Sequence, residues 1–377
     1  MVHQSKQEYL EAIWGRYRRV GKKAKGLILD EFVRVCGYTR KHAISLLNRP
    51  GRKKRKRPGP KHRYGQDVLV VIKALWLATD QLCSKRLKAA IPVWLPFYEQ
   101  QDGPLPDDLR QRVLDISAST MDRLLKPIRV RYGRRGVCAT KPGTLLKKHI
   151  PVRTDNWDIT KPGYLEADTV AHCGTTLEGS FVWSLTFTDI FSGWTENRAC
   201  WNHGAHAVLT QVKSMEAALP FAILGFDTDN GSEFLNWHLM AYLNKRARPI
   251  GWTRSREYRK NDNAHVEEKN WTHVRQLLGY DRIENPQAVA LINDLYSSWN
   301  QLQNFFLPSI KLGSKSRVGS KIIRHYQPIQ TPVQRLLDST DIDDQQKSLL
   351  RQRRDSLNPF DLKKEVEEKL KAVWNLR

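Results

Sequence analysis

Three acidic residues in the middle of the chain have the types and settings that metal-assisted phosphodiester chemistry requires. Asp168 lies in an apolar stretch that starts at Gly163, Asp229 begins an Asp-Asn-Gly turn, and Glu267 opens a helical pattern. Mg²⁺ and Mn²⁺ prefer carboxylate oxygens as ligands. If the three carboxylates converge, they can hold two divalent ions that cleave or join a phosphodiester.

Asp168 is expected in a strand whose two faces differ in character. Because side chains alternate along a strand, one face holds Leu165, Ala167 and Thr169 and the other holds Glu166, Asp168 and Val170. A carboxylate in the middle of a buried strand is costly unless it is paired or binds a metal. The alternative is an exposed edge strand.

The other two acids each have a competing neighbour. Asp227 shares the side of Asp229, and only the Asp-Asn-Gly turn chemistry favours Asp229. Glu267 repeats at helical spacing with apolar residues, which predicts that it faces inward, whereas Glu268 repeats with polar ones. Whether Asp227 or Glu268 assists is left open.

The composition points to a polyanionic partner. The 377 residues carry a net charge of +24 and a pI near 9.9, and such an excess of Lys and Arg is typical of nucleic-acid binding. The length predicts two or three domains. The five scattered cysteines form no Cys-x-x-Cys pair, which favours a reducing cytosol. No stretch approaches the ~20 apolar residues of a membrane span, so no membrane partner is expected.

The first part of the chain predicts a DNA-binding region. Residues 1–65 hold 19 Lys and Arg against 4 Asp and Glu, a net of +15. Residues 1–50 show three helical patterns, with a glycine turn before the third, which is typical of a helix-turn-helix unit. A plain helical bundle with a basic face is the alternative. Residues 51–65 are predicted to be a basic linker that contacts DNA. The predicted contacts of this part are Arg40, Lys41, His42, Arg52, Lys53, Lys54, Arg55, Lys56 and Arg57.

Residues 66–135 are predicted to form a second helical, helix-turn-helix region. Its first helix is expected from Asp67 to Ile91, with a proline-rich break after it, and the candidate turn lies at Ile116–Ser119. Residues 136–160 are predicted to be a basic connector.

Residues 161–285 have the pattern of a mixed sheet covered by helices. Strands are predicted at 164–170, 180–188, 194–198 and 221–226, with a helix at 205–219. Strand, strand, strand, helix, strand, helix is the order of the ribonuclease-H-like fold. Residues 286–377 are predicted to be mostly helical, with a small hairpin. The predicted fold class is therefore α+β and multidomain.

The acidic blocks also resemble a known family. Tyr164–Asp168, Asp229–Phe234 and Asn263–Glu267, in this order, are similar to the catalytic blocks of bacterial insertion-sequence transposases with a retroviral-integrase-like core. The resemblance implies that Asp168, Asp229 and Glu267 are catalytic and hold two Mg²⁺ or Mn²⁺ ions. The lysines that follow the glutamate in retroviral enzymes are absent here. DNA contacts are therefore expected from Arg256, Arg259, Lys260, Lys269 and Arg275.

The resemblance implies a DNA transposase that binds the ends of its element and catalyses strand cleavage and strand transfer. Its partners would be double-stranded DNA, as terminal inverted repeats and target, and further copies of the chain in a dimer or larger assembly. A structure-selective nuclease of the same fold is one alternative. A non-enzymatic helix-turn-helix repressor is another, with the central acids in a purely structural role.

Overall fold

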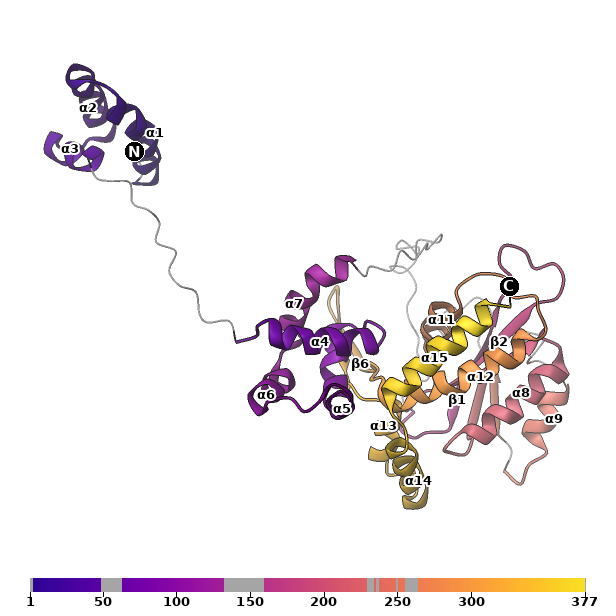
Figure 1. Cartoon of the computed structure of the whole chain (residues 1–377). Helices are drawn as coiled ribbons and strands as arrows, with labels where there is room; N and C mark the ends of the chain where they lie inside the picture. The colour runs from indigo at the N-terminus through magenta and orange to yellow at the C-terminus, as the bar shows by residue number, and fades with distance from the viewer. Residues whose placement is uncertain are drawn as a thin grey trace. The chain divides into compact units, whose positions relative to one another are not determined.

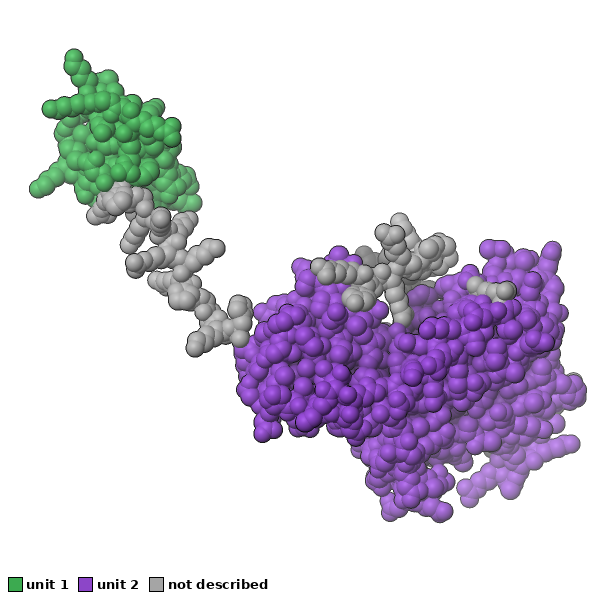
Figure 2. Space-filling model, viewed as in Figure 1, with its two compact units in different colours: residues 1–62 green, residues 63–377 purple. Residues whose placement is uncertain are grey.

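A computed structural model describes residues 3–48, 63–131, 159–228, 234, 237–248, 250–254 and 264–376. The chain divides into two compact units, Met1–His62 and Arg63–Arg377, which Figure 2 shows in different colours. The six-part division predicted from the sequence remains a prediction. No helix in the part of the chain that the structure describes is long and apolar enough to cross a membrane.

The first unit is a three-helix cluster. It contains α1 (His3–Arg19), α2 (Lys22–Cys36) and α3 (Arg40–Asn48). Gly37 ends α2 in the left-handed conformation, with φ of 67°, which glycine adopts without a Cβ penalty. A core of its own joins the three helices, with Phe32, Ala43 and Leu47 fully buried. The predicted helices and glycine turn are present, whereas the DNA-binding role of the unit remains a prediction.

The second unit begins with four helices, α4 (Gln66–Ala78), α5 (Ser84–Asp102), α6 (Asp107–Asp115) and α7 (Ala118–Arg131). The single helix predicted from Asp67 to Ile91 is wrong, because Asp80 and Gln81 have φ of 56° and 61° and end it. The proline-rich break is also misplaced, since Pro92 lies inside α5. The buried face of α5 continues past this proline, and its packing outweighs the lost backbone hydrogen bond.

The centre of the second unit is a five-stranded mixed sheet in the order β3-β2-β1-β4-β5. Strands β1 (Tyr164–Ala171), β2 (Val182–Asp189) and β3 (Thr195–Trp201) pair antiparallel, and β4 (Gly225–Thr228) and β5 (Gly251–Arg254) run parallel to β1. The predicted order of strand, strand, strand, helix, strand and helix is present, whereas β5 was not predicted. The strand predicted at 221–226 is shifted, because pairing begins where Gly163 O accepts the amides of Leu224 and Gly225.

Helices cover both faces of the sheet (Figure 1). One face packs α8 (Ala205–Ala218) and α9 (Trp237–Asn244), in a core that includes Leu165, Leu185 and Phe187. The other face packs α10 (Ala264–Lys269) and the π-helical turn η2 (Asn270–Arg275), followed by α11 (Gln276–Leu278) and α12 (Ala288–Gln301). Glu166 and Asp168 lie on this second face.

The end of the chain closes over the first helices of the same unit. After η3 (Leu302–Phe306) come the hairpin β6 (Leu312–Val318) and β7 (Lys321–Tyr326), then α13 (Pro332–Asp338), α14 (Asp344–Asp355) and α15 (Pro359–Trp374). One apolar cluster contains residues of α4–α7, α12, η3 and α13–α15. Trp94 of α5 illustrates the connection, because its ring nitrogen donates to Phe306 O at 2.8 Å.

Candidate active site

Asp168 lies in the middle of β1 and is partly exposed. The side-chain amide of Asn270, on η2, donates to its Oδ2 at 2.7 Å, and the amide of Thr169 donates to its Oδ1 at 2.7 Å. Its partner across the ladder is Thr186 of β2. These two hydrogen bonds orient the carboxylate.

Glu166, two residues earlier, is fully buried on the same face. Its Oε2 accepts hydrogen bonds from the backbone amides of His265 and Val266, both at 2.9 Å, while its Oε1 has no hydrogen-bond partner. Burial raises the pKa of Glu166 to about 8, and the nearby charges of Asp227 and Glu267 also raise it. Three acids therefore lie close enough to influence one another.

These contacts fix the start of the helical segment that carries Glu267. Glu166 binds the two amides before Glu267, and Asp168 binds the side chain of Asn270, three residues after it. Glu267 is thus held between two anchor points on β1. Glu166 was not among the predicted site residues, although an acid in mid-strand beside Asp168 was a usable signal.

The predicted inward orientation of Glu267 is wrong, since its side chain is exposed. Trp271, expected on the same inward face, is 44% exposed, whereas Asn270 and Val274 are buried. The cause is the π-helical turn, which fits an additional residue into the winding and shifts the buried face by one position. A prediction that assumes a constant α-helical period cannot include this shift.

Asp227 also belongs to the acidic cluster. It is paired in register with Glu166 across the parallel β1–β4 ladder, so both side chains share a face. Thr253 Oγ1 donates to Asp227 Oδ1 at 2.9 Å. Asp229 lies outside the described residues, as do Arg52–Arg57, Arg256, Arg259 and Lys260.

The remaining predicted DNA contacts have different surroundings. Lys41 and His42 are exposed on α3, and Arg40 forms an ion pair with Asp30. Arg275 donates to Ala171 O at 3.0 Å and has its guanidinium 4.8 Å from the centre of a tyrosine ring, so it has a structural role in the absence of DNA. Lys269 lines a cavity of about 220 Å³.

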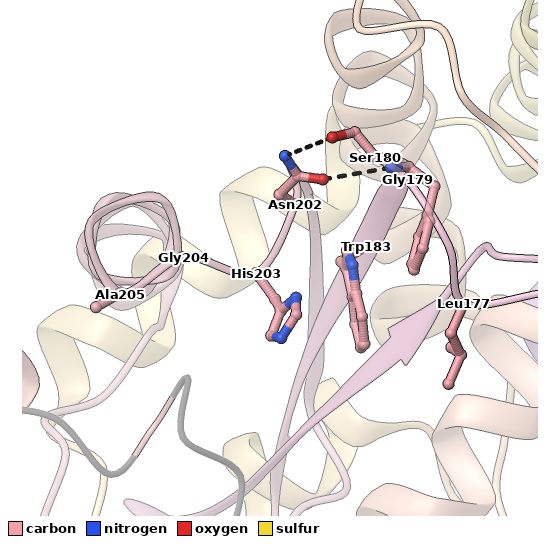
Figure 3. Close-up of a pocket in the computed structure, with 9 residues that line it drawn as sticks. Leu177, Gly179, Ser180, Trp183, Asn202, His203, Gly204 and Ala205 are labelled. Atoms are coloured by element: carbon pink, nitrogen blue, oxygen red, sulfur yellow. Dashed lines mark hydrogen bonds between the residues drawn. The ribbon is translucent and has the colours of Figure 1, made fainter.

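A second cavity, of about 490 Å³, lies at the other end of β2 (Figure 3). The rings of Trp183 and His203 stand 4.2 Å apart in it, and Asn202 bridges to Ser180. Trp183 shares the sheet face of Leu185, which α8 covers, so this cavity lies on the face opposite Asp168. We assign it no role in the acidic site.

The acids of the site can supply oxygen ligands to a divalent cation. Glu166 has a buried oxygen without a hydrogen-bond partner, and Asp168 and Glu267 are accessible from solvent. Within the described ranges, no group of three or more His, Cys, Asp or Glu side chains meets the geometry of a preformed metal site. A complete site would therefore need a residue outside those ranges or a local adjustment.

Comparison with known proteins places the chain in a family. No protein-family model matches it. Over 338 residues, which cover 88% of this chain and 95% of the relative, it is 41% identical to "Uncharacterized protein y4rM" of Sinorhizobium fredii. The chain belongs to the y4rM family. The match covers nearly all of both proteins.

Solved structures also show likenesses to this y4rM-family chain. They include the HTLV-2 integrase catalytic core domain in complex with magnesium, in a dimeric form with a TM-score of 0.29 and 15% identity over 39% of this chain and 90% of that chain. The trimeric form has a TM-score of 0.28 and 15% identity over 38% and 86%. A simian T-cell lymphotropic virus intasome in complex with a PP2A subunit has a TM-score of 0.28 and 14% identity over 48% and 58%. Scores this low support no conclusion about function, so we base the function on the site itself.

Proposed function

We propose that this chain is a DNA transposase that binds the ends of its element and catalyses metal-dependent strand cleavage and strand transfer. One observation carries the proposal. Two acids of β1, Glu166 and Asp168, are hydrogen-bonded to the helical segment on both sides of Glu267. Acids far apart in sequence are thereby gathered on one face of a sheet, in a strongly basic chain.

The acidic cluster has the chemistry of a magnesium or manganese site. We assign Asp168, Asp229 and Glu267 as ligands, with Asp227 and Glu166 beside them, because hard divalent cations prefer carboxylate oxygens. Two bound divalent ions would activate the attacking oxygen and stabilise the leaving oxygen of the phosphodiester.

The residues of the chain have separable tasks in this proposal. Asn270 orients the Asp168 carboxylate through its 2.7 Å hydrogen bond. Glu166 sets the position of α10 through two backbone amides. The excess of Lys and Arg holds the DNA, since each neutralised phosphate releases condensed counterions.

We also propose that the first unit and the following basic segment recognise DNA. Lys41 and His42 are exposed at the start of α3, where a recognition helix would present its N-terminal residues to base edges. Joining two ends of an element requires two sites, so a DNA-bound dimer or larger assembly of the chain is part of the proposal.

The test uses the full chain, Mg²⁺ and labelled DNA taken from both flanks of the gene. Transposition predicts cut strands and strands joined to a target. Asp168→Asn, Asp229→Asn and Glu267→Gln should each abolish both products while DNA binding is retained. Glu178→Gln is the matched control, because it removes an exposed carboxylate from the loop before β2.

The products separate the three functions under consideration. Cut DNA without joined DNA supports a nuclease instead of a transposase. Bound but intact DNA under every divalent metal supports a repressor. Full strand transfer by the Asp168→Asn protein refutes the assignment of the acids.

A further inference from the structure

The cavity that Lys269 lines is built by three parts of the second unit. Thr188 and Ile190 come from the end of β2, His265, Glu268 and Lys269 from α10, and Lys311 and Leu312 from the start of β6. Arg335 of α13 completes the lining. With a volume of about 220 Å³, the cavity has room for a small polar group.

Positive charge predominates in this cavity. Its lining holds the three cations Lys269, Lys311 and Arg335 but a single carboxylate, Glu268. Arg335 is only 5% exposed and fixes the wall by donating to Ser309 O, yet its Nε has no hydrogen-bond partner. A buried cation such as Arg335 is costly without a counter-charge, and an anion in the cavity would offset that cost.

The two lysines keep donors available for such an anion. Lys311 Nζ uses one donor, to Phe191 O at 2.5 Å, and a lysine ammonium has three. The structure gives Lys269 no hydrogen bond or ion pair among the described residues. Asp189, buried behind Lys311, is already occupied by the amides of Gly163 and Ser192.

The cavity is continuous with a basic surface. Leu312 and Tyr326, the paired residues at the base of the β6–β7 hairpin, lie in its lining. Both strands of the hairpin are exposed along almost their whole length. No Asp or Glu occurs from residue 295 to residue 337, whereas the hairpin carries Lys315, Arg317, Lys321 and Arg324.

We infer that this cavity binds a backbone phosphate of a DNA strand, with Lys269 and Lys311 as its ligands and Arg335 as a buried supporting charge. The ligand class is a phosphodiester. The inference rests on the proposed function for the source of this phosphate, since free phosphate is also an anion that the same cations would attract.

The position of the cavity fits a phosphate near the one that reacts. Thr188, in the lining, pairs with Glu166, and Thr186, two residues along β2, pairs with Asp168. Two residues of strand span roughly 7 Å. A DNA strand held by its phosphate in the cavity would therefore extend along the same sheet face to the acids.

The first measurement is the salt dependence of binding to a short random-sequence DNA duplex, without divalent metal, so that it does not depend on catalysis. Lys269→Gln and Lys311→Gln should each reduce the slope of log K against log salt concentration by about 0.9, the value for one lost phosphate contact on duplex DNA. Lys213→Gln is the matched control, because it removes an exposed charge on α8, on the other face of the sheet. Its slope should equal that of the wild type.

The second measurement is titration with inorganic phosphate, followed by ³¹P NMR. The wild type should bind inorganic phosphate saturably. The double variant of Lys269→Gln and Lys311→Gln should bind it at least about tenfold more weakly. Lys311→Arg should bind it with nearly the wild-type affinity. Equal melting temperatures exclude a folding defect as the reason.

The outcomes distinguish this inference from the proposed function. The cavity assignment is overturned if the double variant keeps both the wild-type salt dependence of DNA binding and the wild-type affinity for inorganic phosphate, even if the protein cuts DNA. Loss of inorganic phosphate binding with an unchanged DNA slope also overturns it, because the cavity would then serve free phosphate. Loss of both, in a protein that never cuts DNA, supports the cavity and refutes the enzyme.

Discussion

The side-chain amide of Asn270 donates a 2.7 Å hydrogen bond to Asp168, 102 residues away in sequence. We expect Asn270→Ala to lower the rate of strand cleavage by about 10- to 100-fold, as is typical when a residue that orients a metal ligand is lost. Duplex binding without metal should not change. Thr272→Ala, in the same π-helical turn, is the control. Equal cleavage rates for both variants would show that this hydrogen bond does not matter.

Glu166 is expected to be a stability residue as well as a positioning residue. Glu166→Ala would leave the amides of His265 and Val266 without their acceptor, at a cost of about 1–3 kcal/mol in the free energy of unfolding. Glu166→Gln keeps a carbonyl oxygen at this position and should recover most of the loss. Urea unfolding measures both variants, and equal losses would contradict the role of these two hydrogen bonds.

His172 gives the fold a dependence on acid. Its side chain is buried against Ser184 Oγ at 2.8 Å, and burial, together with the charge of Arg275, lowers its pKa from 6.5 to about 3. Between these values the unfolded chain binds the proton and the folded chain does not. The free energy of unfolding should therefore fall as the pH falls from about 6.5 toward 3, by at most about 1.4 kcal/mol per pH unit.

The comparison of wild type with His172→Gln isolates this contribution. The variant should show a shallower loss of stability over the same pH range. Asp189 acts in the opposite direction, because burial raises its pKa to about 6 and its contribution falls as the pH rises toward that value. Both proteins contain Asp189, so only the difference between their pH profiles is diagnostic. Parallel profiles would contradict the prediction.

Trp94 tests whether the second unit is one cooperative body. It is fully buried, and its ring nitrogen donates to Phe306 O from a helix more than 200 residues earlier. We expect Trp94→Ala to lower the free energy of unfolding by about 3–5 kcal/mol. The sheet should be lost in the same transition as the helices when the unfolding is followed by circular dichroism and by hydrogen exchange. If the sheet stays folded after the helices have unfolded, the second unit consists of two bodies that unfold independently.

Local patterns predicted the sheet well. The alternation around Asp168 identified the face that holds Glu166, and the structure confirms both positions. The start of β4 was misplaced because Phe221 and Ile223 are apolar but lie before the point where β1 offers a partner. Hydrophobicity reports burial, whereas strand bounds depend on the neighbouring strand.

Features that depend on distant contacts were missed. The buried face around Glu267 follows a constant α-helical period only if the helix is regular, and the π-helical turn removes that regularity. The roles of Glu166, Lys311 and Arg335 arise from segments brought together by the fold, and no spacing in the sequence connects them. The predicted DNA contacts on the described residues remain predictions.

The two units differ in how freely they could be exchanged. The helices of the first unit have an apolar core of their own, which contains no residue of the second unit. The sheet is not separate in this way, because one apolar cluster joins it to helices from both ends of residues 63–377. A fragment that contained only the sheet and its acids would expose this apolar cluster to solvent, and we expect it to aggregate.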